Sequence, residues 1–221
     1  GVGFIISLMI LGSLIDLPFS LYRTFVIEQK FGFNKTTPKT FITDLVKNFA
    51  INDIAIGIPL IYTILYLMGT MGEYWWLYVW VLISIFIVFM SFIYPTFIAP
   101  LYNKFEPLNN QKLKNTIDNL LERTGFKSDG VFVMDGSKRS SHGNAYFTGI
   151  GKKKRIVFFD TLMESLSNTE VEATLAHELG HFHHKHIRKR MITLSAILLL
   201  SFFLLGYLID QDWFFHGLGV S

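Results

Sequence analysis

The sequence predicts a polytopic membrane protein, mainly α-helical, with a small α+β module between two of its membrane spans. Of the 221 residues, 51% are hydrophobic and only 17% are charged, against about 25% charged in soluble domains. The apolar residues concentrate in four long stretches, and most of the charge lies between the last two of them. A net charge of +3 is too small to indicate a nucleic-acid partner. The chain has no cysteine, which excludes thiolate metal ligands and cysteine nucleophiles.

Four stretches approach or exceed the length that crosses the hydrocarbon core of a bilayer, which is about 20 residues. The first two carry one charge each and the last two carry none. The third opens on Tyr74, Trp75 and Trp76, an aromatic cluster typical of the membrane interface. We therefore predict spans at about residues 2–22, 49–71, 74–99 and 191–209.

The basic residues indicate how these spans are oriented. Five of the 20 Lys and Arg residues lie between the first and second spans, and the others lie between the third and fourth. Because cytoplasmic loops are enriched in Lys and Arg, we expect both of these loops in the cytoplasm. The predicted organisation is a transmembrane region over 1–100, a cytoplasmic module over 101–190, and the fourth span with a tail over 191–221. Since the chain starts without Met inside an apolar segment, we expect it to be an internal piece of a longer protein.

The module between the third and fourth spans shows helical periodicity in two places and strand patterns between them. The order helix, strand, hairpin, helix indicates an α+β arrangement. The predicted elements are a helix over 111–123 ended by Gly125, a strand over 131–134, a hairpin of strands 145–150 and 155–159 around a basic turn at 151–154, and a helix that is capped by Ser167 or Asn168 and runs through His177 and His181.

The last of these helices contains the motif H-E-x-x-H, formed by His177, Glu178 and His181. Residues i and i+4 lie one above the other on a helix face, so both imidazoles can bind one Zn²⁺ ion. Glu178 is then beside the metal, where it can take a proton from the attacking water. The motif predicts a zinc site with one ion, two histidine ligands and a glutamate general base.

The motif supplies two ligands and leaves the rest of the coordination open. His183, His184 and His186 extend the cluster, but three ligands along one straight helix span about 10 Å and cannot converge on one ion. We expect these three side chains to be solvated or interfacial. The only acids after Glu178 are Asp210 and Asp212, which lie across the membrane in the predicted topology. The third ligand is therefore expected outside this chain.

Several longer strings resemble the type I CAAX prenyl endopeptidases, integral-membrane zinc metalloproteases. The resemblance covers essentially the whole chain. The strings are Ile27–Asn34 (IEQKFGFN), Tyr94–Thr96 (YPT), Pro107–Leu108 (PL), Gly136–Phe147 (GSKRSSHGNAYF) and Arg155–Leu162 (RIVFFDTL). They are far more specific than H-E-x-x-H alone, which indicates only a zincin-like site. Members of that family have seven spans, whereas this chain shows four.

The resemblance implies a membrane-embedded zinc endopeptidase that removes the C-terminal tripeptide of prenylated CAAX proteins. It implies a third zinc ligand, a Glu on a downstream helix, and a substrate that pairs with the edge strand starting at Asn144, Ala145 and Tyr146. The implied partners are a peptide or protein substrate, prenylated in the eukaryotic members, and the lipid bilayer. One alternative is a heat-shock-type membrane metalloprotease that degrades misfolded membrane proteins. Another is a non-enzymatic membrane scaffold whose histidines only bind metal.

Overall fold

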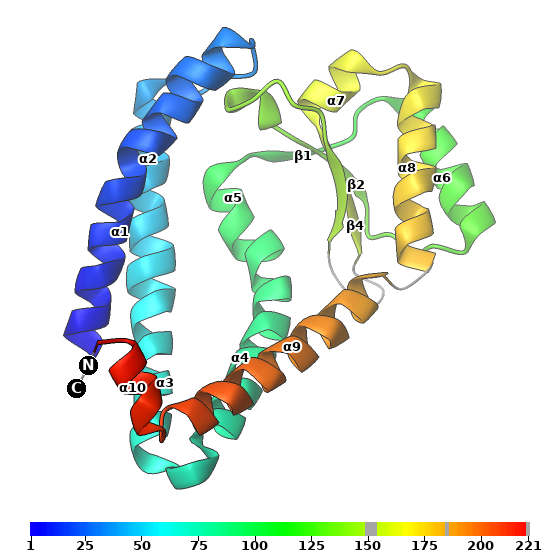
Figure 1. Cartoon of the computed structure of the whole chain (residues 1–221). Coiled ribbons are helices and arrows are strands. Elements are labelled where there is room, and N and C mark those ends of the chain that lie inside the picture. Colours follow the sequence, from blue (N-terminus) through cyan, green and yellow to red (C-terminus); the bar gives the residue numbers. More distant parts are fainter. Residues whose placement is uncertain (149–153, 184–185, 220–221) are drawn as a thin grey trace. The chain divides into compact units, whose positions relative to one another are not determined.

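The computed structural model describes the backbone of residues 1–148, 154–183 and 186–219, together with their side chains except those of residues 181–183, 186 and 187. Within this part the chain is mostly helical and holds one small sheet (Figure 1). This confirms the predicted fold class. The chain divides into two compact units, which are not continuous in sequence.

Four helical stretches in the described residues are long and apolar enough to cross a membrane, as predicted: Val2–Glu28, Pro38–Thr70, Gly72–Tyr102 and Arg188–Leu208. Several continue beyond the apolar segments that the sequence marks, and the first three contain wide π-helical turns. The first comprises α1 (Val2–Tyr22) and a π turn (Arg23–Glu28); the second α2 (Pro38–Asn48), a π turn (Phe49–Gly57) and α3 (Ile58–Thr70); the third a 3₁₀ turn (Gly72–Tyr74), α4 (Trp75–Ile93), a π turn (Tyr94–Ile98) and α5 (Ala99–Tyr102); and the fourth lies within α9 (His186–Leu208), which α10 (Asp212–Gly217) follows.

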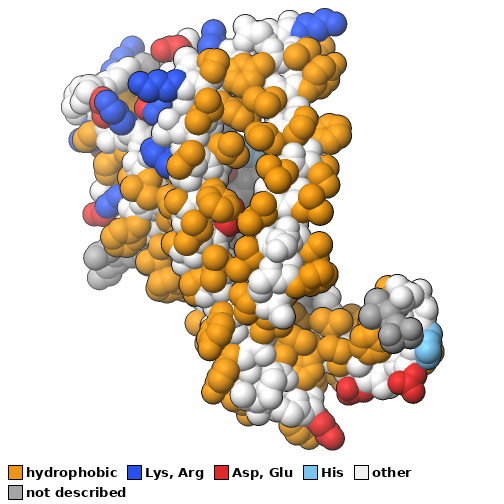
Figure 2. Space-filling model, turned by 90° about the vertical axis from the view of Figure 1, so that its left-hand side faces the viewer, with side chains coloured by type: hydrophobic (Ala, Val, Ile, Leu, Met, Phe, Trp, Pro, Cys, Tyr) orange, Lys and Arg blue, Asp and Glu red, His pale blue; other side chains and the backbone are white. Residues whose placement is uncertain are grey.

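The side chains of these helices are apolar and mostly exposed. No residue of α1, α2 or α3 is buried by the rest of the chain, and Figure 2 shows hydrophobic side chains covering the helical surface on one face. Exposed apolar surface of this extent is not stable in water. The chain is therefore an integral membrane protein that crosses the bilayer several times.

The first unit contains Gly1–Ile10, Lys47–Phe89 and the chain from His186 onward. In it, α4 and α9 are joined by polar contacts between helices. The Trp80 indole N–H donates to the Ser195 carbonyl at 2.9 Å, and the hydroxyls of Ser84 and Ser195 are 3.1 Å apart. Such contacts contribute to helix association in lipid, where water offers no competing partner.

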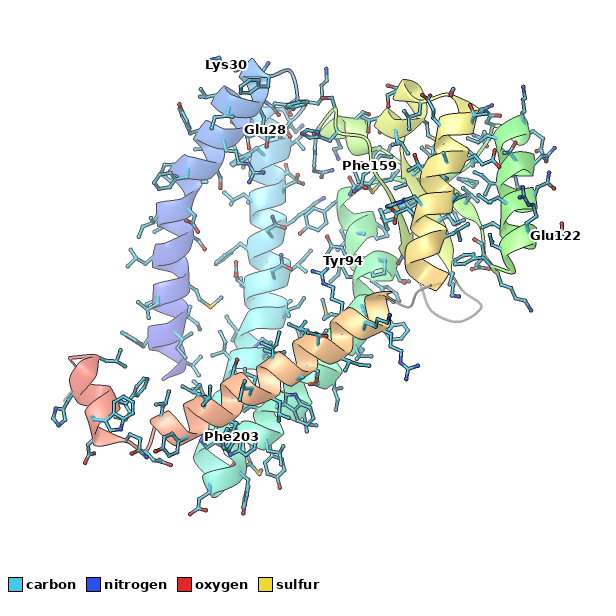
Figure 3. All side chains as sticks on the ribbon, turned by 45° about the vertical axis from the view of Figure 1, so that its right-hand side comes forward. Glu28, Lys30, Tyr94, Glu122, Phe159 and Phe203 are labelled. Carbon is cyan, nitrogen blue, oxygen red and sulfur yellow. The ribbon has the colours of Figure 1, made fainter. Side chains whose placement is uncertain are left out.

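Gly206 of α9 packs tightly against Trp76 of α4. A Cβ at this position would lie 2.7 Å from Cδ1 and 3.0 Å from Cγ of Trp76, and the Trp76 ring also makes an edge contact with Phe203 at 5.3 Å (Figure 3). We expect Gly206→Ala to lower the Tm measured in detergent, because overpacking costs about 1–3 kcal/mol. Gly206→Leu should lower it further.

The matched control for Gly206→Ala is Gly69→Ala in α3. A Cβ at Gly69 would meet nothing within 4 Å, and Ala is the better helix former. The Tm of Gly69→Ala should therefore equal or exceed that of the parent protein. If Gly206→Ala behaved in the same way, close packing at Gly206 would be excluded.

The second unit, Leu11–Val46 with Met90–Lys185, contains the four-stranded sheet. Its strand order is β1-β2-β4-β3. The strands are β1 (Phe105–Pro107), β2 (Val131–Met134), β3 (Ala145–Thr148) and β4 (Arg155–Phe159). β1 pairs antiparallel with β2, β2 pairs parallel with β4, and β3 pairs antiparallel with β4. The predicted strand 131–134 and the antiparallel hairpin are confirmed, although residues 149–153 at its turn lie outside the described residues. The sequence did not predict β1.

Three helices complete this unit: α6 (Gln111–Thr124), α7 (Asp160–Ser165) and α8 (Asn168–His183). The Asn110 side chain accepts the Leu113 N–H at 3.1 Å and caps α6. Gly125, in the left-handed conformation at φ 65°, ends it as predicted. Figure 1 shows α6 and α8 side by side against the sheet. Their buried faces form the core of the unit with β2, β4 and α7, which gives α8 a rigid base.

Candidate active site

The helix with the H-E-x-x-H motif begins with the glutamate half of a capping box. Of the two predicted caps, Ser167 serves: its carbonyl accepts the N–H groups of Glu170 and Val171 at 3.0 Å. In return the Glu170 carboxylate accepts the Ser167 backbone N–H at 2.8 Å and its hydroxyl at 2.7 Å. These hydrogen bonds fix where α8 starts and therefore the rotation at which the motif is presented. The same hydrogen bonds from Ser167 lower the pKa of Glu170.

The capping box predicts a pH-dependent stability difference for Glu170→Gln. Because the pKa of Glu170 is lowered in the folded protein, its carboxylate stabilises the fold above the ordinary pKa. That contribution is lost as the pH falls through the lowered value. The variant should therefore melt below the parent protein at pH 7, and the gap should close in acid. Glu172→Gln on the same helix is the control, for which we expect no such change. A gap for Glu170→Gln that persisted in acid would contradict the assignment.

One face of α8 is anchored in the core and another carries the motif. Val171, Leu175 and Leu179, which follow each other at intervals of four, are at most 5% exposed. His177 is exposed and Glu178 is half-buried. His181 lies one turn after His177 on the same helix, although its side chain is outside the described part. The helix thus holds the two histidine positions on a face that the core does not occupy.

The donor types at this face fit a zinc ion. Two imidazole positions at i and i+4 and an adjacent carboxylate are the protein groups that such sites use. Among the side chains that the structure describes, no three His, Asp or Glu residues are grouped to hold a metal. The side chains of His183, His184 and His186, which we expected to be solvated or interfacial, lie outside this part. A third ligand is therefore not identified within the described residues.

The predicted substrate strand is an edge of the sheet. β3 is last in the strand order, and α8 packs against it. The Asn144 carbonyl accepts the Phe159 N–H at 2.9 Å, so Asn144 is bonded to the neighbouring strand. In an antiparallel pair the direction alternates, and the backbone groups of Ala145 and Phe147 therefore point to the outer edge. The Ala145 N–H meets the Asn144 side-chain oxygen at 2.8 Å.

Tyr146, the third residue of the predicted substrate strand, lies on the face of the sheet opposite the core, because its neighbours Ala145 and Phe147 pack against the core. Its ring makes an edge contact with Phe159 at 6.3 Å, and its hydroxyl lies 3.9 Å from the Met134 sulfur. Burial, together with Tyr94, raises the pKa of Tyr146 to about 12. The contacts of this neutral phenol with Phe159 and Met134 hold β3 against β4 and β2.

The loop that leads into β3 is fastened to α7. The backbone N–H of Ser137 donates to Asp160 at 2.8 Å, and the Ser137 hydroxyl donates to the same carboxylate. Further along the loop, the Thr161 hydroxyl donates to the His142 carbonyl at 2.9 Å. These anchors belong to the strings Gly136–Phe147 and Arg155–Leu162 of the sequence. Their mutual contact has no signal in the sequence, because 23 positions separate Ser137 from Asp160.

Comparison with known proteins identifies both halves of the chain. Residues 1–104 match the family model described as CAAX prenyl protease N-terminal, five membrane helices. Residues 107–214 match the model of peptidase family M48. The two matches meet at the junction between the third membrane helix and the sheet-containing module.

Individual relatives agree with the family models. The chain is 45% identical to CAAX prenyl protease 1 of Saccharomyces cerevisiae over 196 residues, 87% of this chain and 43% of that protein. It is 36% identical to the human CAAX prenyl protease 1 homolog over an alignment of 253 residues with its gaps, which covers 98% of this chain and 53% of that protein. The crystal structure of S. mikatae Ste24p superimposes with a TM-score of 0.91 at 42% identity, covering 97% of this chain and 50% of that one. The chain thus spans about half the length of the curated relatives it matches.

Proposed function

The chain belongs to peptidase family M48, and on this premise we propose that the protein is a membrane-embedded zinc endopeptidase. The observation that carries the proposal is the placement of H-E-x-x-H on a face of α8 free of the core, in a helix that packs against the edge strand β3. A peptide added to that edge would lie beside the motif. We retain residues 101–190 as the proposed catalytic module.

The proposed mechanism assigns a role to each residue of the motif. His177 and His181 would hold the ion, and a further ligand from outside the described residues would be needed beside them. Zinc, when bound, acts as a Lewis acid that polarises the scissile carbonyl and acidifies water. Glu178 accepts the proton of the attacking water and then donates it to the leaving amine nitrogen. The outward Ala145 carbonyl and the backbone N–H and carbonyl of Phe147 would hold the substrate as an extended strand.

The proposed substrate class is the prenylated CAAX protein, from which the enzyme removes the C-terminal tripeptide. The names of the yeast and human relatives support this class. The concentration of Lys and Arg between the first and second spans, and between the third and fourth, supports a cytoplasmic position for the catalytic module. A prenyl group would be retained by the bilayer beside such a module, which brings the adjacent peptide to the site.

The test is cleavage of a farnesylated CAAX peptide by the whole protein, purified with its metal. Mass spectrometry should show release of the C-terminal tripeptide, and the same peptide without farnesyl should be cut more slowly. If the protein left both peptides intact but degraded an unfolded membrane protein, CAAX processing would be excluded in favour of quality-control proteolysis. If it cut neither, the proposed enzymatic function would be refuted.

A further inference from the structure

Arg139 is the centre of a hydrogen-bonded cluster that joins the loop before β3 to two membrane helices. Its guanidinium donates to both carboxylate oxygens of Asp44, in α2, at 2.6 and 2.9 Å. It also donates to the Asn103 side-chain oxygen at 2.6 Å and to the Tyr102 carbonyl at 2.9 Å, at the end of the third span. One arginine thus binds the start of the second membrane helix and the end of the third.

The Arg139–Asp44 pair is largely shielded from water. The side chains of Arg139 and Asp44 are 24% and 19% exposed, whereas those of the exposed pair Arg23–Glu28 are 77% and 28% exposed. Hydrogen bonding to Asp44 raises the pKa of Arg139 despite its partial burial. A bidentate, partly desolvated arginine–carboxylate pair of this kind has a defined geometry. Removing one partner leaves the charge of the other without a counter-charge.

The backbone around Arg139 is held by the first loop. The Arg139 carbonyl accepts the Lys35 N–H and the Thr36 hydroxyl, both at 3.0 Å. The Ser141 N–H donates to the Phe33 carbonyl at 3.0 Å. Residues 33–36 therefore run beside residues 139–141, and Asn34, which is 8% exposed, forms an isolated bridge with Ser140. The loop between the first two spans braces the segment that leads to the substrate strand.

The fixed segment continues without a gap into the edge strand. The Phe33 ring stacks on the His142 ring with their centroids 4.2 Å apart, and Thr161 holds the His142 carbonyl. At Gly143 a Cβ would lie 3.1 Å from Leu162 Cδ1 and 3.2 Å from Leu162 Cα, so the chain passes α7 closely. Asn144 is next, and its carbonyl is bonded to β4. Arg139 and Asn144 are therefore the two ends of one short segment that is held at successive residues.

We propose that Arg139 is a positioning residue for the substrate: through Asp44, Asn103 and Tyr102 it sets where the edge strand β3 lies. The inference rests on the proposed function, because it concerns how the same edge binds a peptide. Arg139 touches neither the peptide nor the reacting atoms in this scheme.

The test measures steady-state cleavage of a farnesylated CAAX peptide by the whole protein with its metal. Arg139→Gln should raise KM by about tenfold and leave kcat within about twofold, because an extended strand contributes binding in ground and transition states alike. Asp44→Asn should raise KM in the same direction, although Asp44 lies 95 positions away in the sequence. The double variant should be no worse than Arg139→Gln, since the two residues act as one unit.

A merely structural role gives a different result. If the variants only lowered the folded fraction, kcat per total protein would fall and KM would not change. Arg23→Gln, which breaks an exposed pair, is the matched control and should leave both constants unchanged. Arg139→Lys keeps the charge but loses the fork geometry, and a KM rise of about threefold is expected for it. It serves as the second variant if Arg139→Gln does not fold.

Binding provides a readout independent of turnover. In a Glu178→Gln background, Arg139→Gln should weaken binding of the fluorescent farnesylated peptide by the same factor of about ten. If the parent protein cleaves the peptide but Arg139→Gln leaves both KM and Kd unchanged, the positioning role of Arg139 is overturned. The proposed function then remains intact. If the parent protein cut no peptide, the proposed function itself would fail, and this inference with it.

Discussion

Replacing Glu178 by Gln is expected to lower peptide hydrolysis by about 10²–10⁴-fold, the usual contribution of a general acid–base group. Gln has nearly the same shape and helix propensity as Glu, so α8 and its packed face should not change. An amide cannot accept the proton of the attacking water at neutral pH. The loss should therefore appear in kcat, and zinc measured by elemental analysis should remain at the parent level.

Glu172→Gln is the matched control for Glu178→Gln. Both residues are half-buried on α8, and both substitutions remove one carboxylate from the helix. Glu172→Gln should retain the parent kcat, KM and zinc content. Activity that survived in Glu178→Gln would refute its assignment as the base, and lost zinc in that variant would assign Glu178 to metal binding instead.

Local signals explain why much of the module could be predicted from the sequence. The helix over 111–123 needs only its own periodicity, the capping side chain of Asn110 and a residue that tolerates a positive φ, and the structure has each of them. The same holds for the capping box at Ser167. The four apolar spans are also local, because bilayer thickness sets their length. Each signal lies within one segment of the chain.

What the sequence could not predict depends on contacts between distant segments. β1 has three residues and exists because it pairs with β2, beyond the intervening helix α6. β2 pairs parallel with β4, and no periodicity specifies the resulting strand order; the edge position of β3 was expected from the family resemblance alone. The pair Arg139–Asp44 joins residues 95 positions apart. The sequence gives no indication that the string Gly136–Phe147 is held by the second membrane helix.

The candidate site combines both kinds of information. The spacing of His177 and His181 follows from helix geometry alone, whereas the packing of α8 against the edge strand follows from tertiary structure. Hydrolysis needs the two together, because a base and an ion act only on a peptide bond that is held beside them. Variants in the motif should therefore lower kcat, whereas variants at Arg139 should raise KM.

Replacing His177 by Ala is expected to abolish zinc binding. A site that loses one of its imidazole ligands should bind zinc at least about 100-fold more weakly, since even the loss of a supporting group costs 10–100-fold. The parent protein should carry close to one zinc per chain, and the variant should be nearly free of it after dialysis against a weak chelator. Because His177 is exposed and opposite the buried stripe of α8, the fold of the module should persist.

His216→Ala is the control for His177→Ala. His216 is an exposed histidine in α10, outside the motif, so its loss should leave zinc content and activity unchanged. Elemental analysis and circular dichroism of the parent protein, His177→Ala and His216→Ala separate loss of the zinc ion from loss of the fold. Stoichiometric zinc retained in His177→Ala would exclude this residue as a ligand. Zinc lost from His177→Ala but kept in Glu178→Gln would divide the motif into the two roles assigned to it, holding the ion and moving the proton.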